Sequence, residues 1–129
     1  MFEEDLPSGV QNFLAEHIQS VGDLEVLLLL KSNANRSWTA ETIALQLRTN
    51  QQLAVRQLKT FESKGFLSSE GNEYRYAPRS EGVDQQVSNL QKTYQERKIS
   101  VINFIYSERL TQIRELAKAF IFRKDPNDG

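Results

Sequence analysis

Amide, hydroxyl and guanidinium groups gather on one face of a short segment, residues 50–64. Such groups form hydrogen bonds with the edges of bases and with phosphates. Arg56 can bind a guanine through two hydrogen bonds, Gln52 can read an adenine, and Lys59 with Thr60 can hold a phosphate. The chemistry that this pattern favours is non-covalent recognition of nucleic acid.

A helical wheel separates this face from a buried one. With Leu58 at the buried centre and steps of about 100° per residue, Ala54 and Phe61 lie on the same side. Gln51 also lies close to Leu58, and Lys59 lies on one shoulder. The far side carries Thr49, Gln52, Arg56, Thr60 and Ser63, with no carboxylate. The alternative is a set of solvated polar side chains on an ordinary helix.

The elements that position this helix can be predicted from capping residues. Ser20 and Asp23 indicate the start of a helix that the run Val26–Leu30 buries. Thr39 is an N-cap candidate for a short helix ending at Leu47. Thr49 or Asn50 can cap the helix that carries the polar face, and Gly65 is suited to end it. Two short helices joined by a tight polar turn form a helix-turn-helix.

A β-hairpin is predicted directly after this helix. The candidate strands run over residues 66–69 and 73–77, with a turn containing Gly71. Tyr74 and Tyr76 lie on one face and Arg75 on the other, from where Arg75 could reach a phosphate or act only as a solubilising charge. Leu53 points outward on the wheel, and it could touch a thymine methyl, pack under the hairpin or mark a protein-binding surface; we favour packing.

Two stretches resemble a known family of regulators. Residues 38–47 and 55–67 are similar to the helix-turn-helix and wing entry of bacterial MarR-type and ArsR-type regulators. The resemblance covers just under half of the chain, and it implies a winged helix-turn-helix domain over residues 20–79 whose third helix enters the major groove of double-stranded DNA. The metal-ligand pairs of metal-sensing ArsR relatives are absent, and the flanking helices are shorter than those that form a MarR dimer. The residues expected to contact DNA are Thr49, Gln51, Gln52, Arg56, Lys59, Thr60 and Arg75.

The remaining segments flank that domain. The expected fold class is mostly α with a small β-hairpin wing, preceded by an acidic helical flap over residues 1–19 and followed by a C-terminal helical region over 80–124 and a disordered tail over 125–129. Lys and Arg minus Asp and Glu gives −4, +2 and +1 for residues 1–19, 20–79 and 80–129, which sum to the net charge of −1. The middle segment is mildly basic.

The C-terminal region has heptad spacing, in which Arg97 is an interruption and Ser107 a candidate cap for a final helix. We expect it to form a homodimer, and the alternative is that it folds back on its own first helix. The residues expected at the dimer interface are Val87, Leu90, Tyr94, Val101, Phe104, Ile113 and Phe120.

Several function classes are disfavoured. The chain has no cysteine and one histidine, His17, and it shows no nucleophile motif, phosphate loop or metal-ligand spacing. We therefore expect no enzyme, cofactor or metal, no membrane segment, and a cytoplasmic location. Two alternatives to DNA binding stay open: a protein-interaction module, and a ligand-responsive regulator with an apolar pocket near Tyr94, Ile102 and Phe104 whose effector is unknown.

Overall fold

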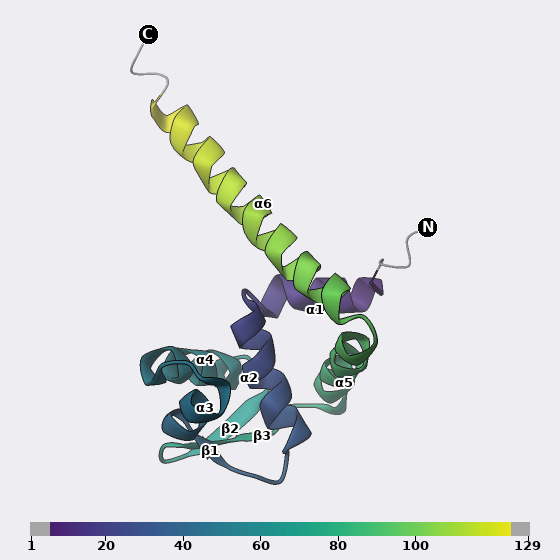
Figure 1. The fold of residues 1–129 in the computed structure, drawn as a ribbon, viewed down its shortest axis with the longest axis vertical. Helices are drawn as coiled ribbons and strands as arrows, with labels where there is room; N and C mark the ends of the chain where they lie inside the picture. Colours follow the sequence, from purple (N-terminus) through teal and green to yellow (C-terminus); the bar gives the residue numbers. More distant parts are fainter. Residues whose placement is uncertain (1–5, 125–129) are drawn as a thin grey trace.

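The computed structural model describes residues 6–124, with the side chains of residues 6–120. The expected tail over 125–129 and the first five residues of the expected flap lie outside these. The described chain is mostly helical with a small three-stranded antiparallel sheet (Figure 1). Its elements are α1 (Ser8–His17), α2 (Val21–Ser32), β1 (Trp38–Thr39), α3 (Ala40–Leu47), α4 (Gln51–Ser63), β2 (Leu67–Glu70), β3 (Glu73–Tyr76), α5 (Glu81–Glu96) and α6 (Lys98–Lys124).

Helix α2 runs through the centre of the body, between α3 and α4 on one side and α5 on the other (Figure 1). It begins as predicted, because the Asp23 N–H donates to the Ser20 hydroxyl oxygen at 3.1 Å. The Asp23 carboxylate then accepts a hydrogen bond from the Gln19 N–H at 3.0 Å. Leu24, Val26, Leu27 and Leu30 are at most 1% exposed. The expected burial of this helix is confirmed.

A tight turn joins α3 to α4. Thr39 caps α3 and forms reciprocal hydrogen bonds with Thr42. Arg48 then adopts a left-handed conformation (φ 59°), which reverses the chain direction. Asn50, rather than Thr49, caps α4, since its side-chain oxygen accepts from the Leu53 N–H at 2.7 Å.

Helix α4 ends at the glycine that the sequence indicated. Gly65 has φ 88°, and its N–H donates to the Glu62 carbonyl while the Phe66 N–H donates to the Phe61 carbonyl, both at 3.0 Å. This pair of hydrogen bonds is the Schellman arrangement, which satisfies the last carbonyls of a helix. The rings of Phe61 and Phe66 pack at 5.8 Å between centroids, so the turn directs the chain into β2.

The sheet has the strand order β1-β3-β2. Strands β2 and β3 form the expected hairpin, and Trp38 of β1 pairs with Tyr74 of β3. Tyr74 and Tyr76 are buried and Arg75 between them is exposed, as their alternation predicted. The Tyr76 hydroxyl donates to Asp84 of α5 at 2.5 Å, and Lys31 of α2 pairs with the same carboxylate at 2.9 Å, so these contacts fix α5 against the body.

The helices of the C-terminal region differ from their prediction at two positions, Arg97 and Ser107. The chain leaves the helix at Arg97, and α6 then runs unbroken from Lys98 to Lys124, so Ser107 begins no new helix. Because of the break at Arg97, the apolar stripes of α5 and of the first turns of α6 both turn toward the body, where both helices contact α1. Helix α1 is therefore packed on the C-terminal region, while its Phe13 also packs on Phe66 at the start of the hairpin.

Three of the seven residues expected at the dimer interface are consequently wrong. Val87, Leu90 and Val101 are 0% exposed, since they lie in the chain's own core and no partner can reach them. Tyr94 and Phe104 are half-buried and pack against the same core. Only Ile113 and Phe120, at 51% and 61% exposure, lie on the part of α6 that extends beyond the body. The alternative of folding back on the first helix describes the inner residues correctly.

Candidate functional site

The outer face of α4 is the polar surface that the sequence indicated. Ala54, Leu58 and Phe61 anchor the helix from behind, at 0–1% exposure. The exposed residues of α4 are Gln51, Gln52, Arg56, Lys59, Thr60 and Ser63. Thr49 is half-buried in the preceding turn. Five of the seven expected contact residues are therefore exposed on α4: Gln52, Arg56, Lys59 and Thr60 on its outer face, and Gln51 at its first position, on the Leu58 side of the wheel.

A buried glutamine fixes the angle of this helix, and sequence reasoning missed it. Gln57 is 7% exposed, and its side-chain amide donates to the Asp23 carboxylate at 2.9 Å. The contact ties α4 to the first turn of α2 at the residue that also helps to cap α2. The Gln57 side-chain oxygen is buried and has no hydrogen-bond partner among the described residues. Its position one residue before Leu58, on the edge of the buried side, is the signal that could have identified it.

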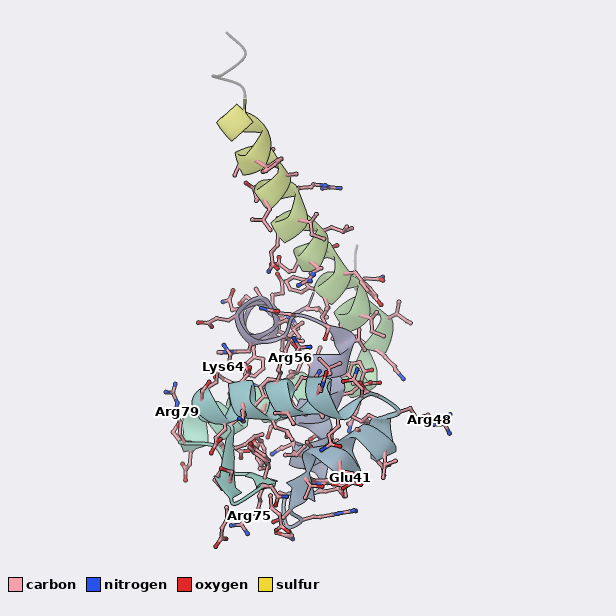
Figure 2. The ribbon with its side chains drawn as sticks, turned by 90° about the vertical axis from the view of Figure 1, so that its left-hand side faces the viewer. Glu41, Arg48, Arg56, Lys64, Arg75 and Arg79 are labelled. Atoms are coloured by element: carbon pink, nitrogen blue, oxygen red, sulfur yellow. The ribbon has the colours of Figure 1, made fainter. Side chains whose placement is uncertain are left out.

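A groove of about 700 Å³ runs beside α4, between this helix, the α1–α2 turn and the base of α6. Arg56 and Lys64 of α4 and Arg109 of α6 contribute cations to its lining. Figure 2 shows Arg56 and Lys64 along the same edge of α4, the edge that faces α1 and α6. The groove also contains Glu16 and Asp23. Leu53, which we expected to pack under the hairpin, is half-buried and instead lines this groove.

Lys64 and Arg109 were not among the predicted contacts. Lys64 follows the last residue of α4, and Arg109 is distant in sequence from α3 and α4. Lys64 lies eight residues after Arg56, so the helix period already places it near the same edge. Arg109 joins them at the groove because of the course of α6. No local sequence pattern carries this last information, because it depends on the chain direction after Arg97.

His17 closes one end of the groove and stays uncharged at neutral pH. Its ring packs against Phe13 at 4.8 Å and Phe66 at 5.2 Å between centroids. Burial lowers the pKa of His17 below its ordinary value, and the neighbouring Lys64 lowers it further. The groove therefore takes its positive charge from the arginines and Lys64.

Arg75 lies apart from the α4 cations. Figure 2 places it on the hairpin, on the opposite side of α4 from Arg56 and Lys64. The residues around it include Glu70 and Glu73, which are paired in register across the hairpin turn. The tip of the hairpin is thus acidic, and Arg75 alone offsets it in part.

Searches among known proteins give no relative. No family model, curated protein or solved structure matches this chain significantly. Within residues 6–124, no group of three or more acidic or histidine side chains is placed to hold a metal ion. No helix of the described part has the length and apolar character needed to cross a membrane.

Proposed function

We propose that the segment from α2 to β3 is a winged helix-turn-helix domain, and that it binds double-stranded DNA with α4 in the major groove as a transcriptional regulator. The observation that carries the proposal is the outer surface of α4, which combines Gln52, Arg56 and Lys59 with no carboxylate. Regulators of this kind act on DNA in the cytoplasm, which is the location expected for this chain.

The order of elements supports the domain assignment. A buried helix, a short strand, two helices joined by a tight turn, and an antiparallel hairpin follow one another as α2, β1, α3, α4, β2 and β3. In this arrangement α3 crosses the backbone, α4 reads base edges and the hairpin serves as the wing. The resemblance of residues 38–47 and 55–67 to MarR-type and ArsR-type regulators agrees with this reading.

The polar residues of α4 divide into two roles under this proposal. Gln52 and Arg56 contact base edges, since their amide and guanidinium groups can form paired hydrogen bonds with adenine and guanine. Lys59 and Thr60 contact phosphates, which position the helix and carry no sequence information. Lys64 and Arg109 extend the cationic surface along the groove, where they attract the backbone of the same duplex.

Selection of bound sequences from a random DNA pool, followed by titration of the selected duplex, tests the proposal. Arg56→Ala should weaken binding about 10- to 100-fold, equivalent to roughly 1–3 kcal/mol for one paired base contact. Lys92→Ala is the matched control, since it removes an exposed cation from α5, on the far side of α2. A pool that yields no enriched sequence, or equal affinity for Arg56→Ala and the control, contradicts the proposal.

Salt dependence separates the two contact roles. Binding should weaken steeply with salt because each neutralised phosphate releases counterions. Lys59→Ala should weaken binding to all duplexes similarly and should lower the salt slope by about 1. Gln52→Ala should instead relax the preference at one base pair and leave the slope unchanged.

A second function, a protein-interaction module without DNA binding, is favoured by one observation. Glu70 and Glu73 place two exposed carboxylates at the hairpin tip, where a wing would approach phosphates. If the chain binds DNA, replacing both with glutamine should tighten binding by removing repulsion. If the hairpin serves a basic protein partner, the same double substitution should abolish capture of that partner and leave DNA binding absent in both forms.

A further inference from the structure

The distal part of α6 carries an apolar stripe that nothing in the described chain covers. Figure 1 shows α6 leaving the body beyond α1 and extending into open space. The exposed large apolar residues of this stripe are Tyr106, Leu110, Ile113 and Leu116, each between 51% and 71% exposed. An isolated helix is marginal in water, and its stability in proteins comes from packing of an apolar face. A partner must therefore cover this stripe.

The stripe has the spacing of a two-helix seam. Tyr106, Leu110, Ile113 and Ala117 follow one another at intervals of four, three and four residues. This spacing keeps all four on one side of a helix that pairs with another. The inner residues Val101 and Ile105 are already buried against the body, so the seam begins where the core ends.

Charges beside the seam do not distinguish the two orientations. Arg109 and Arg114 occupy the two flanking positions, one on each side of the seam. In a parallel pair, Arg109 of each copy would face Arg114 of the other copy. In an antiparallel pair whose axis passes between Leu110 and Ile113, Arg109 lies between Leu116 and Arg109 of the other copy, and Arg114 lies between Ser107 and Arg114. The orientation therefore depends on the sizes of the side chains in the seam.

Side-chain sizes agree with the same antiparallel register. Leu110 of each copy meets Ile113 of the other, and the large Tyr106 meets the small Ala117. A two-fold interface requires a surface that is complementary to itself, and this stretch meets the requirement in size. We propose that the distal half of α6 pairs with the same segment of a second copy in an antiparallel two-helix seam. This pairing does not depend on DNA binding.

Sedimentation equilibrium of the full chain in the absence of DNA tests the association. The wild-type mass should be twice the chain mass of 14.9 kDa. Ile113→Lys should lower it to one chain while the body keeps its helical circular dichroism. Gln112→Lys, an equal charge change at an exposed position outside the seam, should remain a dimer. A monomeric wild type, which would mean that another protein covers the stripe, overturns the proposal, as does a dimeric Ile113→Lys.

Engineered cysteines test the orientation, since the chain has none of its own. Tyr106→Cys and Ala117→Cys chains are prepared separately, mixed and oxidised. The antiparallel seam predicts a mixed disulfide and no disulfide between identical chains, because identical positions would be about 16 Å apart along the axis and a disulfide spans only about 4.4–6.8 Å between Cα atoms. Disulfides between identical chains without the mixed product would indicate a parallel pair and contradict the register.

Discussion

Helix α4 and the distal half of α6 both present exposed surface, but of opposite kinds. Helix α4 is anchored by Ala54, Leu58 and Phe61 and shows water only polar groups and the edges of Leu53 and Val55. The distal half of α6 has no anchor within the chain and exposes large apolar side chains along its length. Exposing a polar surface to water has a small free-energy cost, whereas exposing an apolar stripe is unfavourable until a partner covers it.

This difference leads us to expect a permanent association through α6 and a conditional association through α4. The proposed contacts of α4 with DNA are expected to form and break as the concentrations of DNA and of salt in the solution change. Pairing of α6 buries apolar surface and is expected to persist across the same salt range. Four predictions test how firmly the body holds α4, in contrast to the distal half of α6.

The largest effect should follow from removing the anchor behind α4. Phe61 is 1% exposed and packs on Phe66. Phe61→Ala should lower the free energy of unfolding by about 3–5 kcal/mol, because a buried ring is lost and a cavity remains. Chemical denaturation measures this change. Leu116→Ala on α6 is the counterpart, and it should leave the unfolding of the dissociated chain nearly unchanged; a comparable loss at both sites would remove the contrast.

The glycine that ends α4 should come next. Gly65 has φ 88°, and a Cβ built there would lie 2.6 Å from Cδ of Arg79. Gly65→Ala should lower the free energy of unfolding by about 1–2 kcal/mol, since a side chain is strained in the left-handed region. Thermal melts report the loss. Gly71→Ala has a similar φ of 64° with open space around it, so a larger loss there than at Gly65 would argue against the role of Arg79.

A smaller effect is expected at Gln57. Gln57→Leu keeps the volume and removes the amide that donates to Asp23. The free energy of unfolding should fall by about 1 kcal/mol, because the partly exposed Asp23 keeps its bond from the Gln19 N–H. If Gln57 orients α4, the variant should also bind DNA more weakly than its stability loss explains. Unchanged binding would limit the residue to packing.

The smallest effect is a pH dependence from His17. Burial and Lys64 lower its folded-state pKa from the ordinary 6.5, so between these values the unfolded chain binds more protons than the folded one. The free energy of unfolding should therefore decrease as the pH falls below 6.5 and level off below the folded-state pKa. His17→Phe, which keeps a ring against Phe13 and Phe66, should flatten the profile over that interval. Equal slopes in both proteins would assign the acid sensitivity to other groups, such as Asp84.

The sequence predicted local structure well where capping and periodicity act within a few residues. Ser20, Thr39 and Gly65 hold the roles expected of them, and the alternation around Arg75 gives the correct faces of the hairpin. These features depend on backbone groups close by in the chain. The polar face of α4 was predictable for the same reason, since one helix period determines it.

The arrangement of distant segments could not be predicted in the same way. The spacing from Val83 to Phe104 is interrupted at Arg97, but this interruption alone does not show that the chain leaves the helix there and buries Val87, Leu90 and Val101 internally. Gln57 was assigned to neither face because a polar residue is buried only when a partner such as Asp23 arrives from another helix. Arg109 reaches Lys64 at the groove only because α6 packs beside the body, and no local pattern specifies that packing.

The unbroken course of α6 has a spatial consequence. Arg109 at the groove and Ile113 on the distal stripe are four residues apart, about 6 Å along one helix. A second copy paired at the distal stripe would therefore lie next to the cleft that Arg56 and Arg109 line.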